Sequence, residues 1–128
     1  MRQHFGSFPQ LASGATVPLT KAVRAGDLVF LSGQLGLDEN GRLVAGGVTA
    51  QLHQAFRNIK ALLAEAGASL EQVVKATVWL TDAGDFAAFN EAYRTYFSAL
   101  PPARSTVISA LVIPGASIEI EVVAYVGA

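Results

Sequence analysis

Three charged side chains near the C-terminal end interrupt segments that are otherwise apolar. Arg104 opens the run "ARSTVISAL", and Glu119 and Glu121 alternate with isoleucine in "SIEIEVVAYV". A guanidinium buried without an anion is costly, and its charge-assisted hydrogen bonds to a carboxylate are worth about 1.5 to 3 kcal/mol each. Two alternatives follow. Arg104 either pairs with Glu119 or Glu121 of the same chain, or it binds a ligand that carries a carboxylate. If one glutamate serves as the partner of Arg104, the other stays free and could act as a general base.

Polar residues elsewhere give weaker signals. Asn90 lies close to an aromatic stripe, so its amide must bond either to a neighbouring loop or to a ligand. Gly33, after Ser32 in "SGQ", permits close approach of another strand or of a ligand. His4 and His53 are isolated, and the sequence contains no Ser-His-Asp order, phosphate-binding glycine loop or metal-ligand spacing. We therefore expect an anion pocket without a metal.

Hydrophobic spacing predicts the elements that position these residues. Strands are expected at residues 2–6, 21–24, 28–35, 73–80, 103–111 and 117–126, and the irregular stretch 7–20 is expected to be a loop. Apolar residues three or four apart predict a helix over 48–66 that Gly67 closes. They also predict a second helix, capped by Asp82 or Asp85 and ended by Pro101. The order βββαβαββ, with helices long enough to cover one sheet face, indicates an α+β fold.

Alternation in the last strand separates the two faces of the predicted sheet. The uniformly apolar set, expected to lie under the helices, consists of Ile118, Ile120, Val122, Ala124 and Val126. The other face carries Glu119 and Glu121 with Val123 and Tyr125, and neighbouring strands are expected to add Val29 and Leu31, or Val78 and Leu80. A half-apolar face of this kind predicts burial against other subunits, with a pocket at the seam.

Length and composition limit the class of protein. The 128 residues predict one domain over 1–128, and only 15% of them are charged, with a net charge of −1. The nine Lys and Arg are scattered, which argues against a partner nucleic acid. The chain contains no cysteine, and we see no signal-peptide core or apolar run of membrane-spanning length. We therefore expect a cytoplasmic protein without disulfides.

Four segments, "AVRAGDLVFLSGQL", "NEAYRTYF", "PPARST" and "IPGASIEIEVVA", closely resemble the RidA family, also called YjgF/YER057c/UK114, and the resemblance covers nearly the whole chain. It implies a chorismate-mutase-like fold, in which a mixed sheet carries two helices on one face. It also implies a homotrimer whose sheets form a barrel, with three clefts between subunits. The implied activity is hydrolytic deamination of reactive enamines and imines, such as 2-aminoacrylate, to 2-keto acids and ammonia, without a cofactor.

The resemblance assigns roles to individual residues. Arg104 would hold the substrate carboxylate, and Glu119 would position or activate the attacking water. The cleft-lining positions of the family are matched by Ser32, Gly33, Asn90, Leu19 and Thr106. The expected partners are a small imino or keto acid and further copies of the chain, with no membrane.

Two of these positions depart from the family pattern. Leu19 stands where deaminating members often have a tyrosine, and Thr106 stands where they often have a cysteine. The departures leave a second interpretation open, a non-catalytic trimer that binds or senses a small carboxylate. A translation inhibitor or endoribonuclease, named for some relatives, fits poorly with scattered basic residues, and a chaperone-like role would not depend on Arg104.

Overall fold

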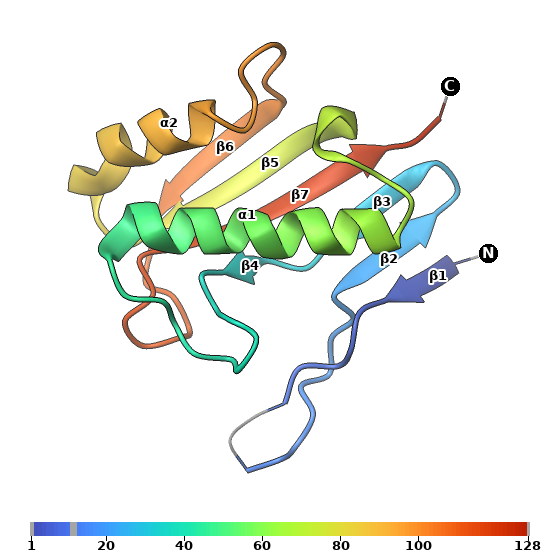
Figure 1. The fold of residues 1–128 in the computed structure, drawn as a ribbon, viewed down its shortest axis with the longest axis horizontal. Helices are drawn as coiled ribbons and strands as arrows, with labels where there is room; N and C mark the ends of the chain where they lie inside the picture. The colour runs from blue at the N-terminus through green and yellow to red at the C-terminus, as the bar shows by residue number, and fades with distance from the viewer. Residues whose placement is uncertain (1, 11–12, 128) are drawn as a thin grey trace.

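One curved sheet carries the strands of the computed structural model, which describes residues 2–10 and 13–127 (Figure 1). The strands are β1 (Arg2–Phe5), β2 (Ala22–Ala25), β3 (Leu28–Leu31), β4 (Gln34–Leu35), β5 (Val73–Leu80), β6 (Ala103–Ile108) and β7 (Ile118–Tyr125). Their order across the sheet is β1-β2-β3-β7-β5-β6, and β4 also pairs with β7. The sheet is mixed, because β5 and β6 run parallel while the other pairs are antiparallel.

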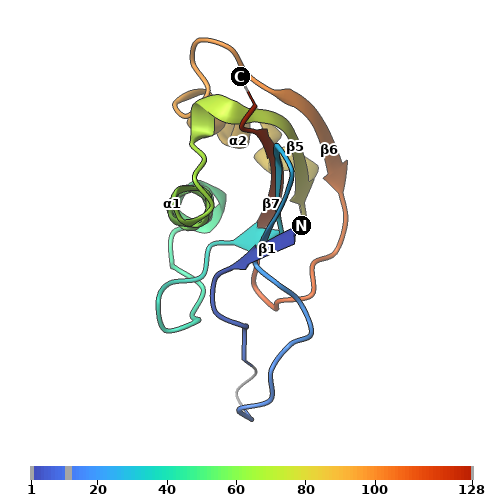
Figure 2. The ribbon, with the colours of Figure 1, turned by 90° about the vertical axis from the view of Figure 1, so that its right-hand side faces the viewer.

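Both helices lie on the same face of this sheet, as Figure 2 shows from its edge. α1 (Gly47–Glu65) runs across the middle of the sheet, and α2 (Phe86–Arg94) lies towards β5 and β6. Short 3₁₀ helices, η1 (Leu70–Gln72) and η2 (Ala83–Asp85), precede β5 and α2. The predicted α+β class is confirmed, and the element order differs only in that the third predicted strand is divided into β3 and β4. No helix among the described residues is long and apolar enough to cross a membrane.

The strand predicted over residues 28–35 is interrupted at Ser32 and Gly33. β3 pairs with the C-terminal part of β7, whereas β4 pairs with its first residues. At the interruption, the N–H of Ser32 donates to the carbonyl of Lys21 (2.8 Å), which continues the pairing of β3 with β2 by one residue. The chain therefore leaves the regular ladder opposite Glu121.

α2 is shorter than the sequence predicted, because it ends at Arg94 and not at Pro101. The hydroxyl of Thr95, directly after the helix, donates to the carbonyl of Ala92 (2.7 Å). Such a bond offers the backbone an alternative to the next helical turn. β6 also ends early, at Ile108.

Asp82 and Asp85, the two candidates for the cap of the second helix, both lie at the start of this helical region. The carboxylate of Asp82 accepts a hydrogen bond from the N–H of Gly84 (2.8 Å) and so caps η2. Asp85 occupies the N-cap position of α2 without a side-chain bond to the helix. The cap predicted for one helix is thus divided between two consecutive helical turns.

The side chains of β7 alternate between the two faces of the sheet. Its fully buried residues are Ile118, Ile120, Val122 and Ala124, which lie on the helix-covered face as predicted. The prediction for the neighbouring strands was wrong: Val29, Leu31, Val78 and Leu80 are buried on that same face, since Val29 pairs with Ala124 and Val78 with Ile120. The open face, which the helices do not cover, instead carries Leu28, Phe30, Thr77 and Trp79 beside Glu119 and Glu121. In a run such as "LVFL" both alternating sets are apolar, so the sequence does not determine which set is buried.

Gln51 is a buried polar side chain on α1, only 4% exposed. Its amide accepts a hydrogen bond from the N–H of Ser117 (2.7 Å) and donates one to the carbonyl of Gly115 (3.2 Å). The helix also lies directly on Gly36, where a Cβ would come 2.6 Å from the Cα of Gln51. These contacts fix α1 to the segments that flank β7 and β4.

Candidate active site

Glu119 lies on the open face of β7. Its pairing partners are Trp79 on β5 and Leu35 on β4. The side chain packs over the backbone of Gly33, where a Cβ would come 2.8 Å from Glu119 Cδ and would overlap one carboxylate oxygen. The close approach predicted at Gly33 is therefore made by a side chain of a neighbouring strand.

The surroundings of Glu119 favour its protonated form. Burial raises the pKa of the carboxyl, and the Glu121 carboxylate on the same face raises it further. A raised pKa brings a carboxyl closer to the range in which a general acid or base works at neutral pH. The environment therefore suits Glu119 for proton transfer.

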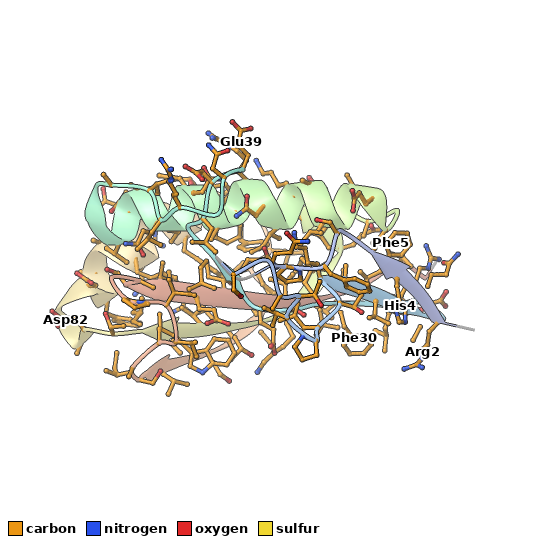
Figure 3. The ribbon with its side chains drawn as sticks, turned by 90° about the horizontal axis from the view of Figure 1, so that it is seen from below. Arg2, His4, Phe5, Phe30, Glu39 and Asp82 are labelled. Atoms are coloured by element: carbon orange, nitrogen blue, oxygen red, sulfur yellow. The ribbon has the colours of Figure 1, made fainter. Side chains whose placement is uncertain are left out.

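A pocket of about 280 Å³ lies on the open face between Glu121 and the Ser32–Gly33 interruption. Its lining residues are Thr20, Val23, Phe30, Leu31, Ser32, Glu121 and Val123. Ser32 Oγ donates to the carbonyl of Thr20 (2.6 Å), which ties the loop over residues 7–20 to the interruption. Phe30 projects from the side of the sheet opposite α1 (Figure 3). The pocket is thus polar at one end and apolar at the other.

Arg104 lies on β6 at the edge of the sheet and faces α2. Its guanidinium carbon is 4.9 Å from the ring centres of both Phe89 and Tyr93, and 5.8 Å from that of Phe86. The residue paired with Arg104 on β5 is Ala76, which is fully buried on the helix-covered face. The ring faces attract the cation, so aromatic side chains occupy the place that the sequence analysis gave to an anion.

Tyr93 is buried beside this guanidinium. Its hydroxyl has no hydrogen-bond partner among the residues that the structure describes. Burial raises the pKa of the Tyr93 phenol, while the charge of Arg104 acts in the opposite sense. Asn90 follows Phe89 on α2, and Thr106 lies two residues beyond Arg104 on the same face of β6; both are half-buried.

The predicted site residues other than Leu19 form two clusters. The glutamate cluster consists of Glu119, Gly33 and Ser32, and the arginine cluster consists of Arg104 and Thr106 on β6 with Asn90 on α2. Leu19 belongs to neither cluster and lines a separate pocket with Phe8 and Thr20. Thr77 of β5 pairs with both Glu121 and Ser105, so Ser105 shares the open face and Arg104, one residue earlier, points to the other side. An ion pair of Arg104 with Glu119 or Glu121 within one chain, the first of the two alternatives, is therefore wrong.

The two histidines make separate local contacts. His53 Nδ1 lies 2.6 Å from the hydroxyl of Tyr96, and His4 Nδ1 lies 3.4 Å from that of Thr20. Within residues 2–10 and 13–127, no group of three or more His, Cys, Asp or Glu side chains could hold a metal ion. The candidate chemistry thus rests on the glutamate and arginine clusters.

Residues 10–126 match the family model described as Endoribonuclease L-PSP. The chain is 41% identical over 117 residues to the 2-iminobutanoate/2-iminopropanoate deaminase of Mus musculus, which covers 91% of this chain and 87% of the relative. It superposes on the crystal structure of RidA from an Antarctic Psychrobacter with a TM-score of 0.81 and 44% identity, over 87% of this chain and 90% of that one.

The chain belongs to the RidA family. A third similar protein of known structure is E. coli TdcF with bound serine, at a TM-score of 0.80 and 36% identity, over 87% of this chain and 90% of TdcF. The family assignment predicted from the four sequence segments is thus confirmed, together with the RidA fold.

The aromatic surroundings of Arg104 were missed by the sequence analysis of this RidA family member. Phe86, Phe89 and Tyr93 were interpreted only as the buried stripe of a helix. Their spacing of three and four residues places all three rings on one side of α2, and this side faces β6. The sequence feature that could have indicated this contact is an arginine on a strand that follows a helix with such an aromatic stripe.

Proposed function

We propose that the chain hydrolyses small 2-imino acids to 2-keto acids and ammonia, in a site that a second copy of the chain completes. The observation that carries the proposal is the separation of Arg104 and Glu119 onto opposite faces of one sheet. A reaction that needs both side chains at one substrate must take one of them from a neighbouring copy. The name of the mouse relative, an imine deaminase, supports the reaction class.

The open face of the sheet supports association of several copies. Leu28, Phe30, Val107 and Tyr125 are each between 38% and 44% exposed on it. Four large apolar side chains left exposed on one face of a sheet favour burial of that face against another copy of the chain. We expect a homotrimer with three equivalent clefts, and light scattering at micromolar concentration should give three times the mass of the chain. A monomeric mass would remove the second copy from the proposal.

Arg104 binds the carboxylate of the substrate in this proposal. Its guanidinium carbon lies 4.9 Å from the ring centres of both Phe89 and Tyr93, and the attraction of ring faces for a cation does not by itself satisfy the N–H donors. A guanidinium can form two parallel hydrogen bonds to a carboxylate. The serine bound to TdcF is also a ligand with a carboxylate, which supports this class of ligand for the family member.

Glu119 handles the protons of the attacking water. The water oxygen adds to the carbon of the protonated imine while Glu119 accepts one water proton, and the resulting tetrahedral carbinolamine carries the former imine nitrogen as an amine. Glu119 passes this proton to the nitrogen and then accepts the hydroxyl proton as the C–O double bond forms and the C–N bond breaks. Ammonia and the 2-keto acid leave, and Glu119 releases the last proton to solvent. General base catalysis of this kind contributes roughly 10² to 10⁴-fold in rate, and orientation by Arg104 adds to it.

A second candidate function is binding without turnover. Leu19 supports it, because its side chain supplies no hydroxyl at the position where deaminating members often carry a phenol. A trimer of this kind would sense or sequester a small carboxylate through Arg104 alone. Ammonia release separates the two functions.

The decisive experiment measures ammonia release from freshly generated 2-aminoacrylate, with the rate in buffer subtracted. We expect the wild type to accelerate it and Arg104→Lys to lose most of the acceleration, because an ammonium cannot form the two parallel bonds of a guanidinium. Arg94→Lys, at the exposed end of α2, is the matched control and should keep wild-type rates. Suppose that the wild type does not accelerate ammonia release but binds pyruvate, and that Arg104→Lys abolishes this binding. This result would favour the second candidate function, binding without turnover.

A further inference from the structure

Residues 8 and 16–20 line a second pocket, an open one of about 290 Å³. Its lining residues are Phe8, Thr16, Val17, Pro18, Leu19 and Thr20. Phe8 is 62% exposed and Leu19 is 38% exposed, so both present apolar surface that a ligand would cover. The volume lies at the lower end of the range for ligand pockets and suits a side chain of a small molecule rather than a whole cofactor.

The lining of this pocket is mixed, with apolar side chains from Phe8, Val17, Pro18 and Leu19 and hydroxyls from Thr16 and Thr20, and several of its backbone groups are paired with one another. The N–H of Val17 donates to the carbonyl of Pro9 (2.8 Å), and the N–H of Leu19 donates to that of Val17 (2.8 Å). Gln10 and Thr16 form an isolated antiparallel bridge across the loop. With these backbone groups paired to one another, the side chains of Phe8, Val17, Pro18 and Leu19 are the part of the pocket that an apolar group of a ligand would contact.

The second pocket adjoins the pocket on the open face. Thr20 lines both, and the pocket on the open face also contains Ser32 and Glu121. The hydrogen bond from Ser32 Oγ to the Thr20 carbonyl fixes the two pockets relative to each other. A ligand whose polar end lies beside Ser32 and Glu121 can therefore extend an apolar tail towards Leu19 and Phe8.

We propose that the second pocket binds the side chain of the substrate and gives the chain a preference for 2-imino acids with branched or aromatic side chains. The inference rests on the proposed deaminase function and adds the substrate class to it. Oxidation of the corresponding apolar amino acids at their α-carbon supplies such imines. The reaction itself is unchanged: water adds at the imine carbon and ammonia leaves.

Burial of an isobutyl or benzyl group in the pocket sets the size of the preference. Full burial of such a group gains enough free energy for roughly ten- to 100-fold in kcat/KM over a methyl group. Leu19→Ala and Phe8→Ala remove part of the wall, so each should reduce this ratio by about three- to tenfold. Both residues are on an exposed loop, so the melting temperature should change little.

The test compares imines generated in place by an amino acid oxidase from leucine, phenylalanine and alanine. The readout is the ratio of kcat/KM for the leucine- or phenylalanine-derived imine to that for the alanine-derived imine. Val112→Ala is the matched control, because Val112 is 92% exposed and lies outside both pockets. We expect a ratio well above one for wild type and control, and a lower ratio for Leu19→Ala and Phe8→Ala.

Different failures separate the two proposals. Equal or faster hydrolysis of the alanine-derived imine would overturn the side-chain pocket and leave the deaminase function standing. If no imine is hydrolysed faster than in buffer, the deaminase function fails, and calorimetry with 4-methyl-2-oxopentanoate and pyruvate decides the pocket. Tighter binding of the branched keto acid, lost in Phe8→Ala, would still support it, and equal affinity would overturn it.

Discussion

The glutamate cluster and the arginine cluster hold opposite charges by opposite means. Glu119 lies against backbone, in the space left by the missing side chain of Gly33, and its neighbours disfavour its charge. Arg104 lies against the rings of Phe89 and Tyr93, which favour its charge without neutralising it. A carboxyl that can exchange a proton and a cation that keeps its charge are complementary tools for one reaction.

The position of the two clusters on opposite faces of the sheet keeps Arg104 and Glu119 apart within one chain. Within one chain, contact between the two would produce an ion pair, and such a pair would lower the pKa of Glu119 and occupy the N–H edge of Arg104. Opposite faces keep both groups available. The proposed association of copies then brings them to one substrate with a ligand between them.

The largest effect is expected when Arg104 and Glu119 are replaced in separate variants, which are then mixed. Arg104→Lys and Glu119→Gln should each reduce ammonia release by roughly 10²-fold or more when every subunit carries the change. Equal amounts of the two variants, unfolded and refolded together, should recover activity in about a quarter of the sites, because each mixed cyclic trimer has one interface with both native residues. The measurement is ammonia release per subunit before and after mixing. Absence of recovery would place both residues in the site of one chain.

Filling the space under Glu119 should have the next largest effect. Gly33→Ala forces the Glu119 side chain away and should cost about 1 to 3 kcal/mol in the free energy of unfolding, with a loss of turnover. Gly84→Ala is the control, since its Cβ would meet only the flexible side chain of Asp82, at 3.2 Å. Chemical denaturation and ammonia release on the same samples check the prediction. Native stability in Gly33→Ala would contradict the packing of Glu119 on this residue.

A smaller effect is expected at the arginine cluster. Phe86→Leu removes the outermost ring face, 5.8 Å from the guanidinium carbon of Arg104, and should weaken keto-acid binding about two- to fivefold. Phe86 is 43% exposed, so the melting temperature should hardly change. Calorimetry with pyruvate provides the measurement. The same loss in a variant that already carries Arg104→Lys would show that the ring acts on something other than the guanidinium.

The smallest effect concerns pH. Turnover requires ionised Glu119 and is lost as the pH falls through its raised pKa. Glu121→Gln removes a charge that raises this pKa, so the acid limb of the pH–rate profile should move to lower pH. A limb that stays in place, with the rate at neutral pH unchanged, would mean that a different group titrates.

Patterns within one segment predicted the structure well. The apolar set of β7 is uniform from Ile118 to Ala124, and the other set contains two glutamates, so only one face of that strand fits a core. The family segments likewise predicted the fold. The run "LVFL" in β3 has no such contrast, and the side of Val29 follows from its pairing with Ala124, which local sequence does not contain.

The candidate site depended more on long-range register. Whether Arg104 meets Glu119 is decided by the pairing of both β6 and β7 with β5, and a shift of one residue in either pairing would reverse the answer. The residue types of the two clusters were predictable from sequence, and Gly33 was singled out for close approach. Their division between two faces was not, because it is a property of the sheet and not of any segment.

Gln51 of α1 bonds to Gly115 and Ser117, which lie 64 and 66 residues further along the chain. It therefore couples the opening of α1 to that of the segment before β7. If α1 lifts from the sheet, the bonds to Ser117 and Gly115 break together and leave a buried amide without partners. The segment before β7 therefore cannot fluctuate independently of the helix, although it is irregular. In amide hydrogen exchange, the protection of Ser117 should follow that of the buried turns of α1 and not that of the exposed loops.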